Sequence, residues 1–155
     1  MRITSIITIL ILLFFKEAVS QNLSFDEKFF ESASVFYKKS SIPGFIKKEF
    51  KKSSGYKIKM ANPGKKYQAS DVRSNPFLPT RRLICLIKAP STYILFYEHG
   101  GRGKHKHCIV FKMDGRKVEK VISLSVSPML PSYEELRAAL LNNKYSELSQ
   151  NSCRF

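Results

Sequence analysis

Negative charge is scarce in this chain. It has 12 aspartate and glutamate residues against 27 lysine and arginine residues, which gives a formal net charge of +15 over 155 residues. A positive field of this size attracts polyanions such as nucleic acid, anionic lipid headgroups and acidic polysaccharide, and it does not distinguish among them. The charge therefore predicts an anionic polymer or an acidic protein as the partner.

Several catalytic signatures are also missing. The sequence has no serine nucleophile elbow, no Ser-His-Asp ordering and no paired-cysteine redox motif. The glycine-rich residues 100–103 lack the strand-to-helix context and the Lys-Ser/Thr ending of a nucleotide-binding loop. No internal repeat and no low-complexity tract is present. These absences exclude the common enzyme motifs and repeat architectures.

Cysteine is too sparse for a disulfide framework. The chain has Cys85, Cys108 and Cys153, an odd number. If the strands form a simple meander, Cys85 and Cys108 lie two strands apart, roughly 10 Å, which is beyond the reach of a disulfide. Two interpretations stay open: Cys153 pairs with one of the other two, or Cys85 and Cys108 are plain buried hydrophobic residues.

The N-terminal apolar run has the form of a signal peptide. Arg2 supplies a short positive region, residues 6–15 are apolar, and residues 18–20 are small enough for a signal peptidase. The run is shorter than the ~20 apolar residues that a membrane-spanning helix needs. We therefore expect a signal peptide at 1–20, cleavage after Ser20, no transmembrane anchor in the cleaved protein, and a secreted or periplasmic location.

The remaining residues 21–155 are expected to form a single α+β domain with helices at both ends. Ser24 and Glu27 have the spacing of a capping box, and an apolar stripe at helical spacing continues to near Ser40. A second, short helix is predicted from about residue 45 to Gly55, followed by a half-buried edge strand at 56–60. A second capping box at 132–135 begins a C-terminal helix that residues 142–143 end.

The pattern between residues 81 and 127 predicts a meander. Residues 81–88 are apolar on both faces and indicate an inner strand, and further apolar runs follow at 93–97, 109–111 and 121–126. The last two runs are separated by Asp114-Gly115, a dipeptide typical of a two-residue hairpin turn. The predicted fold is an antiparallel sheet of four to five strands (about 81–127), packed by N-terminal helices and a C-terminal helix.

All three histidines fall at one end of a predicted hairpin. If residues 100–104 form the loop, His99 lies opposite His105, and Tyr97 lies opposite His107. The three imidazoles then project to one face and can bind zinc or another transition metal. Surrounding positive charge disfavours a dication, and Glu98 is the one neighbouring carboxylate available to complete the shell.

An anion fits the same hairpin tip better. Backbone N–H groups of a glycine-rich loop and nearby cations can hold a phosphate or sulfate group, although these glycines are equally consistent with a plain hairpin tip. The predicted anion-binding residues are Arg102, Lys104, His105, Lys106 and His107. A secondary basic patch, which is more typical of a solvated helix face than of a polyanion contact, consists of Lys47, Lys48, Lys51 and Lys52.

These features predict an exported small basic protein that is a non-catalytic binding module for an anionic partner and needs no cofactor. One alternative is a small secreted nuclease or metal-dependent hydrolase that uses Glu98, His99, His105 and His107 for acid-base work or metal binding. A further alternative is an inhibitor or immunity-type protein whose basic face blocks an acidic target.

Overall fold

The computed structural model describes residues 23–70, 75–101, 105–127 and 130–148. In these ranges the chain has an α+β fold with a seven-stranded sheet and three α-helices. The predicted signal peptide and Cys153 lie outside the described residues. The elements, in chain order, are α2 (Glu27–Glu31), β1 (Ser34–Phe36), the 3-10 helix η1 (Lys39–Ser41), α3 (Gly44–Ser54), β2 (Met60–Ala61), β3 (Arg81–Ala89), β4 (Thr92–His99), β5 (His105–Asp114), β6 (Lys117–Val126), α4 (Tyr133–Leu141) and β7 (Tyr145–Leu148).

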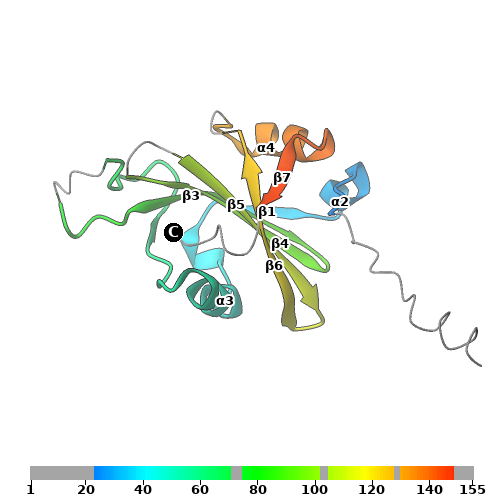
Figure 1. Ribbon diagram of the computed structural model, residues 1–155, viewed down its shortest axis with the longest axis horizontal. Helices are drawn as coiled ribbons and strands as arrows, with labels where there is room; N and C mark the ends of the chain where they lie inside the picture. The colour runs from blue at the N-terminus through cyan, green and yellow to red at the C-terminus, as the bar shows by residue number, and fades with distance from the viewer. Residues whose placement is uncertain (1–22, 71–74, 102–104, 128–129, 149–155) are drawn as a thin grey trace, which may run out of the picture.

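Four long strands form the centre of the sheet (Figure 1). β3, β4, β5 and β6 pair antiparallel in chain order, which confirms the predicted meander. Three short strands extend it: β1 pairs antiparallel with β3, β2 pairs parallel with β3, and β7 pairs antiparallel with β6. The predicted number of four to five strands was therefore too low, because strands of two to four residues carry almost no alternating pattern.

Helices cover both faces of the sheet (Figure 1). On one face, Ile46 and Phe50 of α3 pack in a core cluster with Tyr97. On the other face, α2 and α4 cover a second cluster in which Leu136 of α4 packs with Phe96. Because side chains alternate along a strand, β4 contributes to both cores. This two-sided burial explains why the strands read as nearly continuous apolar runs.

The first helix is shorter than predicted. We expected a helix from Ser24 to near Ser40, but α2 ends at Glu31 and residues 34–36 form β1. The N-cap is Asp26, whose Oδ1 accepts a hydrogen bond of 2.8 Å from the backbone N–H of Phe29. The pairing of β1 with residues 86–88 of β3 satisfies backbone groups at the outer edge of that strand. This tertiary pairing overrides the helical spacing of the apolar residues.

Helix α3 and the C-terminal helix follow the sequence signals closely. Gly55 ends α3 with a positive φ of 75°, as a C-cap glycine should. The capping box at the start of α4 is present, because the Ser132 side chain accepts from the Glu135 backbone while the Glu135 carboxylate accepts from the Ser132 backbone. Asn142 is the C-cap, and Asn143 has a positive φ of 52°.

Two local predictions need correction. The β5–β6 turn consists of Gly115 and Arg116, one residue later than predicted, because Asp114 pairs with Lys117 across the hairpin. Gly115 has a φ of 56°, the conformation that this turn requires. The edge strand predicted at 56–60 is present only as β2 (Met60–Ala61), and Tyr56 is 59% exposed.

The two described cysteines are buried hydrophobic residues. Cys85 and Cys108 belong to the same core cluster, are free thiols, and are both paired in register with Phe96, which lies between them. Burial raises the pKa of Cys85 to about 12 and also raises the pKa of Cys108. Of the two interpretations, the structure therefore shows the one in which these cysteines serve packing.

Candidate functional site

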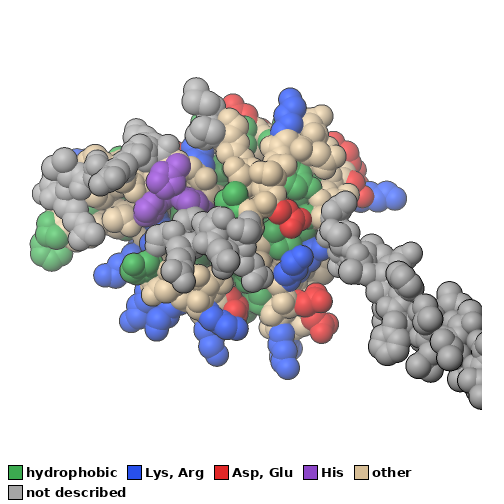
Figure 2. All heavy atoms as spheres, viewed as in Figure 1, with side chains coloured by type: hydrophobic (Ala, Val, Ile, Leu, Met, Phe, Trp, Pro, Cys, Tyr) green, Lys and Arg blue, Asp and Glu red, His purple; other side chains and the backbone are tan. Residues whose placement is uncertain are grey.

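The three histidines meet at the loop end of the β4–β5 hairpin. His99 pairs in register with His105, and Tyr97 with His107, as predicted. One nitrogen from each ring lies within 4.8 Å of the others, and Nδ1 of His99 is 3.3 Å from Nε2 of His105. Figure 2 shows the histidine side chains at the molecular surface. We call these three residues the histidine cluster.

The surroundings of His99 and His107 favour the neutral form of these two rings. His107 stacks on Tyr97 with ring centroids 5.0 Å apart and an interplanar angle of 19°. Burial lowers the pKa of His99 to about 4, and the nearby charges of Arg81 and His105 act in the same direction. Burial together with His105, His99 and Arg81 lowers the pKa of His107 to about 3. Neutral imidazoles are poor contacts for an anion and are the form that ligates a metal.

Glu98 is separated from the histidine cluster by the sheet. Adjacent strand residues project to opposite faces, so the Glu98 side chain points away from His99. There it accepts hydrogen bonds from Arg82, at 3.0 Å from Nε and 2.6 Å from Nη2. Lys106 pairs in register with Glu98 and projects to the same side. The structure therefore brings the three histidines together without Glu98 or Lys106, while Arg102 and Lys104 lie outside the described residues.

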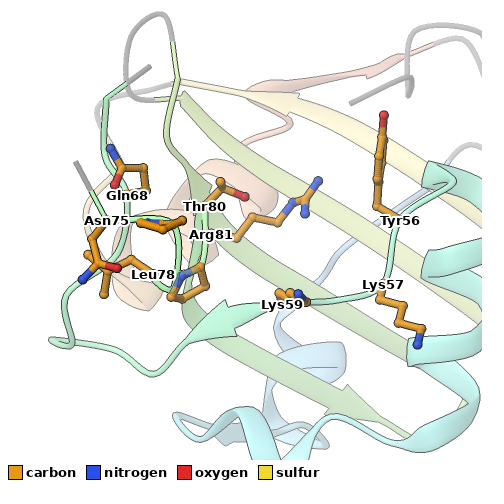
Figure 3. Close-up of a pocket in the computed structure, with 10 residues that line it drawn as sticks. Tyr56, Lys57, Lys59, Gln68, Asn75, Leu78, Thr80 and Arg81 are labelled. Carbon is orange, nitrogen blue, oxygen red and sulfur yellow. The ribbon is translucent and has the colours of Figure 1, made fainter. Parts of the chain in front are cut away.

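Sequence reasoning missed a cationic pocket beside the start of β3 (Figure 3). The pocket has a volume of about 290 Å³. In Figure 3 the Arg81 side chain extends from β3 toward the side of the pocket that carries Tyr56, while Lys57 points away from it. The lining residues whose side chains are polar or charged are Tyr56, Lys57, Lys59, Gln68, Asn75, Thr80 and Arg81. Among the described residues that line it, Lys57, Lys59 and Arg81 are cationic and none is acidic.

Arg81 is the most unusual residue of this pocket. It is only 6% exposed, its Nε has no hydrogen-bond partner, and it makes no ion pair with a carboxylate of the described residues. Its guanidinium lies over the Phe50 ring, 5.6 Å from the ring centroid. A buried charge without a counter-ion costs several kcal/mol, which an anionic ligand would offset. The sequence signal was a cation at the start of an otherwise apolar strand.

Lysines concentrate in the segment that leads to this pocket. Residues 38–66 contain ten lysines and one acidic residue, Glu49, for a net charge of +9. All ten lysines are exposed. They include the predicted secondary patch, whose residues lie on α3, and Figure 2 shows blue side chains gathered over the region of α3. The full set, which we call the lysine surface, is Lys38, Lys39, Lys47, Lys48, Lys51, Lys52, Lys57, Lys59, Lys65 and Lys66.

Gly100 connects the histidine cluster to the cationic pocket. A Cβ at this position would lie 1.9 Å from the backbone oxygen of Gln68, so only glycine fits. The backbone N–H of Gly100 donates to the carbonyl of Thr80 at 2.9 Å, and that of Gln68 donates to Pro79 at 2.9 Å. Because Gln68 and Thr80 line the pocket, the hairpin end and the pocket wall pack as one unit.

Comparisons with protein-family models, with curated proteins and with solved structures found no match. No helix within the described ranges has the length and apolar character needed to cross a membrane. The functional argument is therefore built on the two features described above, the histidine cluster and the cationic pocket with its lysine surface.

Proposed function

We propose that this protein is an exported, non-catalytic binding module for an anionic partner that carries phosphate or sulfate groups. The observation that carries the proposal is the buried Arg81, a cation without a carboxylate partner among the described residues, in the wall of a pocket that also contains Lys57 and Lys59. Guanidinium groups bind phosphate and sulfate through paired, charge-assisted hydrogen bonds. One such group on the partner would occupy the pocket.

The lysine surface supports a polymer rather than a small anion. Ten exposed lysines within residues 38–66, two of which line the pocket, provide many weak contacts for repeated anionic groups. Their one acidic neighbour, Glu49, lies 3.7 Å from Lys52, whose side chain is 79% exposed, so this ion pair contributes little and leaves the surface strongly positive. The predicted N-terminal signal peptide would place this surface outside the cytoplasm.

A hydrolytic role has weaker support. General acid-base catalysis needs an ionisable side chain, most often an imidazole or a carboxylate, within hydrogen-bond reach of the reacting group. Glu98, which we considered for that role, is engaged by Arg82 on the sheet face opposite His99. No acidic residue is among the described residues that line the cationic pocket.

The test is polyanion binding measured as a function of salt. Duplex DNA, heparin and anionic lipid vesicles are offered to the purified protein, and the slope of log affinity against log salt is compared between variants. Neutralising two lysines with Lys47→Gln/Lys51→Gln should weaken binding to the preferred polymer. For duplex DNA it should reduce the salt slope by roughly 2, since each phosphate contact contributes about 0.9.

A matched control removes the same charge elsewhere. Lys117 and Lys120 are exposed on β6, beside Glu119 and outside the lysine surface. The variant Lys117→Gln/Lys120→Gln should leave the slope close to that of the unmodified protein. If both double variants lost the same amount of affinity, the binding would depend on net charge alone and not on the lysine surface. Failure of the unmodified protein to bind any of the three polyanions would refute the proposed function.

A further inference from the structure

We propose that His99, His105 and His107 bind one Zn²⁺ ion, with a fourth coordination position open to water. This inference is independent of the lysine surface, because it uses other residues and another class of ligand. It concerns a site of imidazole nitrogens at the end of one hairpin.

The spacing of the ligand atoms fits zinc. Tetrahedral zinc with Zn–N bonds of ~2.0–2.1 Å places neighbouring ligand nitrogens roughly 3.3–3.4 Å apart. Nδ1 of His99 and Nε2 of His105 are already 3.3 Å apart. The nitrogens of all three rings lie within 4.8 Å of one another, so small side-chain rotations bring the third ligand to the same ion.

The backbone that carries the cluster is well ordered by strand pairing. The β4–β5 register is continuous from Thr92–Lys112 to His99–His105. His105 and His107 are two residues apart on one strand and therefore share a face. The stacked, fully buried ring of Tyr97 fixes the plane of His107. Little reorganisation is needed to bind a metal, which favours affinity.

The type of ligand selects the class of metal. Imidazole suits zinc, copper and nickel, whereas calcium and magnesium need oxygen ligands. The Cys108 thiol is buried in the opposite core, and the Glu98 carboxylate is held by Arg82, so neither completes the site. Three protein ligands with a water in the fourth position form a familiar zinc arrangement. The exposed ring of His105 lies on the solvent side and leaves that position accessible.

One charge opposes the ion. Arg81 pairs in register with His99 across β3 and β4, and its guanidinium is close enough to lower the pKa of that histidine. Repulsion from this cation weakens binding of a dication. We therefore expect a weaker site than a zinc ion buried among thiolates, but one that is still occupied at one equivalent.

The experiment measures metal content and coordination of the untagged, full-length protein. After treatment with a chelator, the protein is dialysed against Zn²⁺ and its zinc content is determined by elemental analysis. We expect one zinc per chain. Titration with Co²⁺ should give the intense visible absorption of four-coordinate cobalt, and Zn²⁺ should abolish that absorption.

Two variants identify the ligands. His105→Asn alters an exposed ring and should fold normally, while its affinity for Zn²⁺ should fall about a hundredfold or more, since loss of a residue that merely orients a ligand already costs 10- to 100-fold. The matched control Lys106→Gln changes the neighbouring residue, which projects to the opposite face, and should keep full zinc content.

Three results would overturn the assignment: no zinc retained by the unmodified protein, equal zinc in His105→Asn, or a cobalt spectrum of six-coordinate type. Measuring polyanion binding in the presence of a chelator tests the proposed function separately from the zinc site. We expect it to be unchanged, so a failed zinc experiment and a failed polyanion experiment would be recognised as different failures.

Discussion

Arg81 and Arg82 are adjacent in sequence, yet their side chains lie in different environments. Arg82 donates two hydrogen bonds to Glu98 and lies over the Tyr67 ring, with its guanidinium 4.6 Å from the ring centroid. Arg81 lies on the other face, where the aromatic ring of Phe50 is its described contact. Strand alternation therefore divides one basic dipeptide into a structural ion pair and a buried cation, which is the one that we propose binds a ligand.

Replacing Arg81 by methionine tests this division. Arg81→Met removes a buried charge without a counter-ion, so we expect the free energy of unfolding of the ligand-free protein to rise by about 1 kcal/mol or more. Phosphate, compared with chloride at equal ionic strength, should raise the Tm of the unmodified protein and lose that effect in the variant. The measurement is thermal unfolding in the two salts.

The neighbouring residue supplies the control for this prediction. Arg82→Met breaks an ion pair and strands Glu98, so it should lower stability while preserving the response to phosphate. A phosphate response that persists in Arg81→Met would show that the anion binds elsewhere.

The histidine cluster should make the stability of the metal-free protein depend on pH. The pKa values of His99 and His107 in the fold, about 4 and about 3, lie below the ordinary value of 6.5. The unfolded chain therefore binds protons first on acidification. The stabilisation is complete above pH 6.5 and is lost as the pH falls through 4 toward 3, with a slope of at most about 1.4 kcal/mol per pH unit for each ring.

The variant His99→Asn/His107→Phe isolates this contribution. It removes both titrating rings while keeping an aromatic ring against Tyr97, and it retains every carboxylate. Urea unfolding between pH 7 and 4.5, in the presence of a chelator, should give a flatter dependence on pH than in the unmodified protein. If the free energy of unfolding changed with pH equally in the variant and in the unmodified protein, the lowered pKa values of His99 and His107 would be contradicted.

Among the secondary-structure elements, those with local signals were predictable from sequence. The capping box of α4, the glycine that ends α3 and the long apolar strands are each specified by residues next to one another in the chain. β1 and β7 were not predictable, because their three and four residues form strands only by pairing with β3 and β6. The same dependence on pairing explains why the helix expected at 24–40 ended early.

Part of the candidate site was predictable for the same reason. Loop length set the β4–β5 register, so the pairing of His99 with His105 followed from counting residues. The sequence did not reveal that Arg81 would be buried without a described carboxylate partner. Whether an arginine has a carboxylate partner depends on which acidic residues the fold brings near, and Glu98, the nearest in register, projects from its strand beside Arg82 instead.

A substitution at Gly100 should weaken both binding sites, because the end of the β4–β5 hairpin packs directly against the loop around Gln68. Gly100→Ala places a methyl group against the backbone oxygen of Gln68, and overpacking of this kind costs about 1–3 kcal/mol. We expect lower stability together with weaker zinc and polyanion binding, measured on the same preparation. Gly44→Ala, at an α3 position where a Cβ meets no atom within 4 Å, is the control and should keep all three properties. Loss of one binding activity alone would show that the two sites are not coupled.

For the whole molecule, the placement of the charge matters more than its total. The composition alone predicts an anionic partner, but residues 38–66 hold a net charge of +9 out of +15. The fold brings this segment together through α3 and through a 2.8 Å hydrogen bond from the Lys39 backbone to the Asn62 side chain. Tyr56, Lys57 and Lys59 of this segment line the pocket together with Arg81. The protein therefore has one strongly charged region rather than an evenly charged surface.

The ends of the sheet also limit how a partner can attach. The outermost described strands are β1 and β2 beside β3, of three and two residues, and β7 beside β6, of four residues. The part of β6 beyond the described pairing with β7 carries Lys117, Glu119 and Lys120. Short or charged edges offer little backbone for an added strand from another chain. Recognition by main-chain hydrogen bonding is therefore disfavoured. For the proposed anionic partner, we expect selectivity to come from how the spacing of its anionic groups matches the spacing of the cations.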